Sequence, residues 1–190
     1  MKIEDNVMHE IYDQLLKSSN YKSRKLNIKK FNQDNKYIKK GIAITPVKFG
    51  ISFTTWHLNQ AGALVHIYTD GSIYLNHGGI EMGQGTNTKI AQLVSNAFGL
   101  SYEKVKISST NTSKVPNTSA SAASSTTDLN GAAALNAVSK IKENLEKFIK
   151  KKYNIRNIKN VVYKNGLIKV NNKSFKFNSI IQEAYLNRIS

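Results

Sequence analysis

Apolar residues recur along the chain at two different spacings. Val7, Ile11 and Leu15 lie at helical spacing within residues 6–17, and residues 21–35 form a second, lysine-rich helical stretch. The helical period then stops, and residues 41–54 indicate extended chain. The pattern predicts an N-terminal helical segment over residues 1–37 and a main domain over residues 38–190.

The next part of the chain alternates apolar and polar residues before the helical period returns. Residues 59–79 predict a β-hairpin that turns at Asp70-Gly71, because this residue pair readily adopts the positive φ angles of a tight turn. Residues 86–98 predict an amphipathic helix, and Gly99 follows where a helix-ending glycine belongs. Residues 101–110 predict a short turn and a strand.

The second half of the chain continues this mixture of helices and strands. A long helix is predicted over 127–152, capped by Thr127 or Asp128, and a final helix over 179–188. Between them, residues 161–177 predict a meander with turns at 165–166 and 171–172. The fold class is therefore α+β, with antiparallel hairpins packed against amphipathic helices. The last helix stops abruptly, so we expect part of a larger domain, truncated at its C-terminus.

Composition narrows the possible functions. The chain has 190 residues and no cysteine, so it can supply no disulfide, cysteine zinc site or cysteine-held iron–sulfur cluster. Its start carries acidic residues and lacks the apolar core of a signal peptide, and no run of residues is apolar enough to span a membrane. We therefore expect a cytoplasmic protein.

The net charge of +16 leaves one alternative function open. A strongly basic chain is typical of a nucleic-acid-binding module. Here the excess is mostly lysine, accompanied by many asparagines and isoleucines, and it is spread over residues 22–40 and 140–175 rather than gathered around aromatic residues. A biased codon composition explains this pattern as well as nucleic-acid binding does.

Two stretches place glycine and small hydroxylated residues directly before a predicted helix. They are HGGIEMGQG, residues 77–85, and PNTSASAASSTTDLNG, residues 116–131. Helix starts offer unpaired N–H groups and partial positive charge, and glycine lets a ligand approach the backbone. The two loops are thus typical of a cradle for a phosphorylated ligand, if they meet in space. The same residues also suit a glycine turn and a Ser/Thr-rich helix cap without any ligand.

The amino-acid sequence of these regions also shows a specific resemblance to a known family. Residues 48–92 and 115–131 closely resemble the molybdenum-binding subunit of xanthine dehydrogenase, a member of the molybdenum hydroxylase family with xanthine oxidase and aldehyde oxidase. The resemblance is strong over residues 38–150. It implies that residues 38–190 are a partial molybdopterin-binding domain. Molybdenum is held by the cofactor's own dithiolene in this family, which agrees with the absence of cysteine ligands.

The resemblance also implies which residues contact the cofactor. The GQG motif would place the Gln84 side chain against the pterin and let the backbone approach at Gly83 and Gly85. In the second motif, paired alanines would lie near the molybdenum, and the hydroxyls after them would contact pterin and phosphate. The implied cofactor-binding residues are Gly83, Gln84, Gly85, Ala122, Ala123, Ser124, Thr126 and Thr127, with no metal ligand from the protein.

The implied reaction is hydroxylation of a purine of the hypoxanthine or xanthine class. The family's FAD and 2Fe-2S clusters are expected on other domains or subunits, which would be this chain's partners together with the rest of the molybdenum subunit. The resemblance places the general-base glutamate beyond Ser190, so we expect no catalytic residue here and no turnover by the chain alone. A non-catalytic gene remnant is the alternative within the same family.

Two titratable residues of the first loop are candidates for other roles. Glu81 lies near a helix start, where we expect local hydrogen bonding rather than general-base catalysis. His77 and Glu81 are four residues apart, but the glycine pair between them argues against the helical face that a metal site of this spacing needs.

Overall fold

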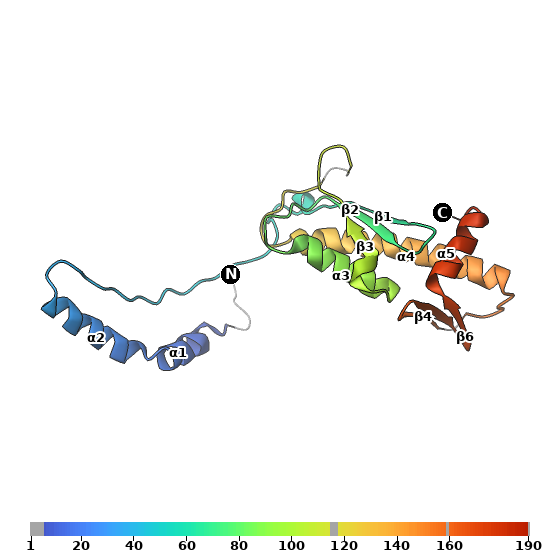
Figure 1. The fold of residues 1–190 in the computed structure, drawn as a ribbon. Coiled ribbons are helices and arrows are strands. Elements are labelled where there is room, and N and C mark those ends of the chain that lie inside the picture. Colours follow the sequence, from blue (N-terminus) through green and yellow to red (C-terminus); the bar gives the residue numbers. More distant parts are fainter. Residues whose placement is uncertain (1–5, 115–117, 159, 190) are drawn as a thin grey trace. The chain divides into compact units, whose positions relative to one another are not determined.

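The computed structural model describes residues 6–114, 118–158 and 160–189 (Figure 1). The chain divides into two compact units, the first ending at Gly50 and the second beginning at Ile51. The helical segment predicted for residues 1–37 lies in the first unit. The boundary that we placed between residues 37 and 38 stays a prediction.

The first unit contains the two predicted helices, α1 (Met8–Ser18) and α2 (Tyr21–Asp34). Neither helix buries any residue, and the apolar stripe of α1 is exposed. After α2 the chain turns back toward the helix, where Lys40 places its ammonium 4.0 Å from the centre of the Phe31 ring, and the stretch predicted as extended, residues 41–54, contains no strand.

The second unit begins with a three-stranded sheet. β1 (Ala63–Ile67) and β2 (Ile73–His77) form the predicted antiparallel hairpin, with Val65 opposite Leu75. β3 (Val105–Ile107) pairs with β2 in parallel, which sequence patterning did not reveal. A parallel pair needs a crossover connection, and here that connection contains α3 (Thr86–Phe98).

α3 and the long helix α4 (Thr126–Lys152) pack against each other and against the sheet (Figure 1). Their approach is close, because a Cβ added at Gly131 of α4 would lie 2.8 Å from a methyl group of Leu93 on α3. Burial alternates along β1 and over Ile73–Leu75 of β2, as expected for a sheet covered on one face, whereas Asn76 and His77 at the end of β2 are both buried. The core of this layer includes Val65, Ile73, Leu75, Ile90, Val94, Phe98 and Val138.

A second sheet and the last helix complete the unit. β4 (Val161–Lys164), β5 (Leu167–Val170) and β6 (Lys173–Lys176) form the predicted antiparallel meander, and α5 (Phe177–Leu186) follows. α3 ends at Gly99 in the left-handed conformation, as predicted, and the Gly99 carbonyl accepts a hydrogen bond from Gly166 N–H at 2.8 Å. This contact joins the meander to the first layer.

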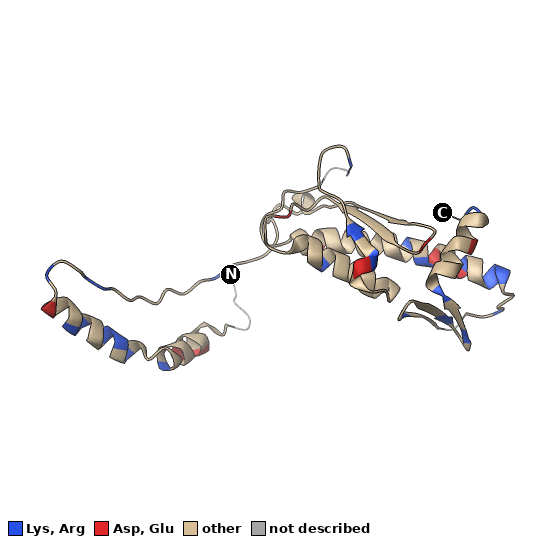
Figure 2. Ribbon diagram, in the orientation of Figure 1, with Lys and Arg blue, Asp and Glu red and all other residues tan. Residues whose placement is uncertain are grey.

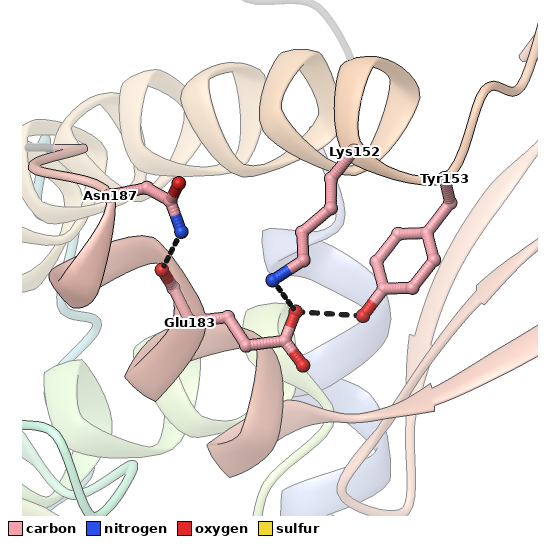
Figure 3. Close-up of polar contacts among 4 residues, drawn as sticks. All are labelled: Lys152, Tyr153, Glu183 and Asn187. Carbon is pink, nitrogen blue, oxygen red and sulfur yellow. Dashed lines mark hydrogen bonds and ion pairs between the residues drawn. The ribbon is translucent and has the colours of Figure 1, made fainter.

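α5 is tied to the end of α4 by a polar cluster (Figure 3). Glu183 Oε2 accepts a hydrogen bond from the Tyr153 hydroxyl at 2.7 Å and lies 3.0 Å from Lys152 Nζ. Two donors on one carboxylate oxygen thus link α5 to the carboxyl end of α4.

Two short 3₁₀ turns complete the elements, at Trp56–Leu58 and Tyr102–Lys104. Among the described residues, none of the helices combines the length and the apolar character needed to cross a lipid bilayer.

Candidate functional site

The first glycine-rich stretch starts at the buried end of β2. His77, Gly78 and Gly79 are all buried, which breaks the alternation of the strand. The Thr110 hydroxyl lies within hydrogen-bond distance of two carbonyl oxygens in this stretch. They are those of His77 at 3.1 Å and Gly79 at 2.8 Å. The segment after β3 thereby holds the loop in place before the chain becomes exposed at Ile80.

The two stretches singled out in the sequence meet in space. Gly78 N–H donates to Asn130 Oδ1 at 3.1 Å, and Ile80 N–H donates to Ser121 Oγ at 2.7 Å. A Cβ added at Gly79 would lie 2.8 Å from the Thr126 methyl group. The starts of α3 and α4 therefore share one polar surface. Pro116 and Asn117, which open the second motif, lie outside the described residues.

The start of α3 is closed by a side chain from its own loop. Glu81 Oε1 accepts the N–H groups of Gly83 at 2.9 Å and Gly85 at 3.0 Å, and Oε2 accepts that of Asn87 at 2.9 Å. These backbone hydrogen bonds, that of Asn87 foremost and then that of Gly85, lower the pKa of the Glu81 carboxyl. The expected local hydrogen bonding is confirmed.

Gln84 folds its side chain back over the same loop. Its Oε1 accepts Met82 N–H at 2.5 Å, and its Nε2 donates to the Ile80 carbonyl at 2.8 Å. The glycines on either side adopt positive φ, +94° at Gly83 and +80° at Gly85, and a Cβ at either position would meet no neighbouring atom. The backbone is therefore approachable at both positions, and the glycines meet a conformational need.

The second loop makes a tight turn before α4. Ala123 and Ser124 both have φ of +52°, and the Ser125 N–H and hydroxyl both donate to the Ala122 carbonyl, at 3.3 and 3.2 Å. Two successive residues with positive φ between hydrogen-bonded ends are the pattern of a type I′ turn. Small side chains suit this backbone, since bulky residues adopt positive φ only with strain. Ala122 and Ser124 are exposed.

The turn sets the start of α4 slightly earlier than predicted. The N-cap is Ser125 rather than Thr127 or Asp128, and Thr126 is the first helical residue. The reason is the Ala122–Ser125 turn, which already directs the chain into the helix. Thr126 and Thr127 consequently lie in the first turn of the helix and are half-buried.

Burial sets the protonation of His77. Desolvation lowers the pKa of its imidazole, against smaller opposing effects of the Asn87 side chain and the Glu81 charge. Nδ1 accepts Gly79 N–H at 3.1 Å, so this nitrogen carries no proton. Among the described residues, His77 Nε2 and Asn87 Oδ1 are buried without a hydrogen-bond partner of normal geometry. Because His77 ends a strand and Glu81 lies in a loop, the two form no helical metal-binding pair.

Charged residues are sparse at this surface. Lysines and arginines lie along α2 and toward the carboxyl end of α4, whereas the starts of α3 and α4 are largely uncharged (Figure 2). Within residues 77–85 and 118–127, Glu81 is the charged residue, and Lys89 of α3 and Asp128 of α4 follow within the first four residues of their helices. The joined loops can therefore offer hydroxyls and the Gln84 amide to a polar ligand.

Sequence reasoning missed residues that join the loops. Asn130 connects Gly78 to α4 and also donates from Nδ2 to the Thr126 carbonyl at 3.0 Å. A signal was present, because asparagine occupies the buried stripe of an otherwise apolar helix face. Thr110 carried no such signal, since it follows a short strand in a polar segment.

The family of the chain follows from comparison with known proteins. The model of the molybdopterin cofactor-binding domain matches residues 14–190, which include both loops and cross the division between the two units. The chain belongs to this family of molybdopterin cofactor-binding domains.

The chain is similar in sequence to several xanthine dehydrogenases. The chain is 50% identical to xanthine dehydrogenase of Dictyostelium discoideum over 153 residues, which are 80% of this chain and 11% of that protein. It is 52% identical to xanthine dehydrogenase/oxidase of Gallus gallus over 145 residues, 76% of this chain and 11% of that protein. The chain thus spans about a tenth of the length of these relatives.

Solved structures give the same fold. Quinoline 2-oxidoreductase from Pseudomonas putida 86 matches with a TM-score of 0.58 at 21% identity, over 67% of this chain and 16% of that one. The reconstituted CO dehydrogenase of Oligotropha carboxidovorans matches with a TM-score of 0.59, also at 21% identity, over 66% of this chain and 16% of that one. The α+β fold is confirmed, and the resemblance seen in the sequence is confirmed by the family model and by the similarity to xanthine dehydrogenases.

Proposed function

We propose that this chain forms part of the cofactor site of a xanthine dehydrogenase-like molybdenum hydroxylase acting on purines in the cytoplasm. The molybdopterin cofactor would lie on the joined loops. The residues proposed to contact it are Gly83, Gln84, Gly85, Ala122, Ala123, Ser124, Thr126 and Thr127. The remaining parts of the molybdenum subunit and an FAD and iron–sulfur subunit would be its partners.

The contact between the two loops is the observation that carries this proposal. The bonds from Gly78 to Asn130 and from Ile80 to Ser121 place two helix starts on one surface. A phosphorylated pterin needs hydrogen-bond donors and acceptors at several points, together with close approach to the backbone. Open space above Gly83 and Gly85 and the small side chains of the second loop fit such a ligand.

The protein's role at this surface is to bind and orient. When bound, the molybdopterin cofactor supplies the metal-centred redox chemistry of the reaction. The Gln84 amide retains a free donor and a free acceptor position beside the hydrogen bonds that it makes within the loop. The hydroxyls of Ser124, Thr126 and Thr127 add further polar groups, and Ala122 leaves the space above the turn open.

Replacing Ala122 with leucine tests the proposal. Ala122 is exposed and begins the turn without adopting positive φ, so Ala122→Leu should leave the unfolding temperature unchanged while filling space that the ligand needs. We expect Ala122→Leu to bind the isolated cofactor about tenfold more weakly than the wild type, or more weakly still. Pterin fluorescence measures this binding. Ala132→Leu, at an exposed position of α4, is the matched control. Unchanged cofactor affinity in Ala122→Leu would refute the assignment.

A further inference from the structure

The carboxylate of Glu81 lies on the backbone groups that an anionic ligand of α3 would use. One oxygen accepts two glycine N–H groups, and the other accepts Asn87 N–H in the first turn of the helix. The unpaired N–H groups of a helix start normally attract phosphate. At this helix start, three backbone donors already have an acceptor, and that acceptor is charged.

The contact also arranges the loop that follows β2. Glu81 gathers the N–H groups of Gly83 and Gly85, so it holds both glycines in their positive-φ conformations. Gln84 lies between those glycines and closes the loop through Met82 N–H and the Ile80 carbonyl. The Ile80 N–H in turn reaches Ser121 of the second loop. The hydrogen bonds of Glu81, Gln84 and Ile80, linked through the backbone of residues 80–85, thus connect the start of α3 to the second loop.

We propose that Glu81 is a positioning residue that occupies the start of α3, fixes residues 80–87 in the form that presents Gln84, and keeps anionic groups away. The inference rests on the proposed cofactor site and refines it. The first loop would face an uncharged polar part of the cofactor. Any phosphate of the cofactor would be held elsewhere on the joined loops.

The charge at the start of α3 supports placing an uncharged part of the cofactor at the first loop and any phosphate elsewhere. An ionised carboxylate compensates the partial positive charge of the helix end and repels a second anion placed beside it. Glu81 is exposed, so it is placed by its hydrogen bonds rather than by packing. The second loop contains no acidic residue between Thr118 and Thr127, and Asp128 follows it as an exposed residue in the first turn of α4.

Amide exchange in the full chain tests the contact without any cofactor. In Glu81→Gln one carboxylate oxygen becomes an NH₂ donor, which cannot accept from a backbone N–H. Hydrogen exchange should therefore become about tenfold faster at the amides of Gly83, Gly85 and Asn87. NMR measures these exchange rates. The control Glu103→Gln makes the same charge change in the exposed 3₁₀ turn before β3 and should leave these amides unaffected. Unaltered exchange in Glu81→Gln would overturn the proposal.

Inorganic phosphate tests the exclusion of anions, which a merely structural role would not affect. In the wild-type chain, added phosphate should leave the NMR resonances of the Gly83, Gly85 and Asn87 amides unchanged. In Glu81→Gln, added phosphate should shift these resonances. Equal shifts in both proteins would overturn the exclusion. With the cofactor itself, Glu81→Gln should bind about tenfold more weakly than Glu103→Gln. If the wild type bound no cofactor, the proposed function would fail, while the exchange and phosphate results would still decide the role of Glu81.

Discussion

At the scale of single residues, close packing between the loops explains why two adjacent glycines follow β2. A Cβ at Gly78 would collide with the Thr118 side chain, and one at Gly79 would lie 2.8 Å from Thr126 and 3.2 Å from His77. Neither glycine has positive φ, so close approach rather than backbone conformation requires them. Gly83 and Gly85 present the opposite case, with positive φ and open space.

Alanine at position 79 should therefore weaken the fold. Gly79→Ala pushes the first loop away from α4 and should lower the free energy of unfolding by about 1–3 kcal/mol. Chemical denaturation measures this loss. Gly41→Ala is the matched control, because a Cβ there meets nothing within 4 Å. Equal stability of Gly79→Ala and Gly41→Ala would show that the loops are not packed as described.

The sequence revealed the residue types of the site but not their partners. The sequence alone predicted that glycines and hydroxyls before two helices would form a polar surface, and that Glu81 would bond locally. It could not predict that Gly78 bonds to Asn130 or that Ile80 bonds to Ser121. Those bonds depend on how the parallel pairing of β2 and β3 places α3 against α4.

At the scale of elements, the joint between α4 and α5 depends on one carboxylate (Figure 3). The pKa of Glu183 is lowered mainly by the hydrogen bond from Tyr153 and next by that from Lys152. Burial first, and then the contact with Glu183, raise the pKa of Tyr153 to about 12. The tyrosine therefore stays protonated and donates at neutral pH.

Removing the Tyr153 hydroxyl should loosen this joint. Tyr153→Phe should lower the free energy of unfolding by about 1 kcal/mol at pH 7. A carboxyl whose pKa is lowered by folding stabilises the fold fully above its ordinary value, here 4.5, and loses that effect as pH falls through the lowered value. The difference between wild type and Tyr153→Phe should thus shrink in acid. Tyr185→Phe, at an exposed position of α5, is the control. A difference that persists unchanged in acid would contradict this account.

Most elements could be predicted because their apolar period is local. α3 has the predicted limits of 86 and 98, and the predicted turn at 165–166 is present, with positive φ at both residues. What patterning could not supply was non-local. The parallel contact of β3 with β2 joins strands that are separated by a whole helix, and the start of α4 depends on a turn of non-glycine residues with positive φ.

At the scale of the whole molecule, the chain corresponds to a short part of much longer proteins. It spans about a tenth of their length, and the apolar stripe of α1 is exposed in the first unit. The buried hydrophobic side chains described here run from Val65 to Ala184, all in the second unit. The second unit therefore contains both the core and the joined loops on which the functional proposal depends.

The most direct test is an NMR titration of the full chain with the isolated molybdopterin cofactor. The amides of residues 80–87 and 119–127 should shift together and give one dissociation constant, because a single ligand would contact both loops. The amides of α2 and of the Asn165-Gly166 turn should stay in place. Shifts confined to one loop, or found only outside both loops, would contradict a cofactor site built from the two helix starts.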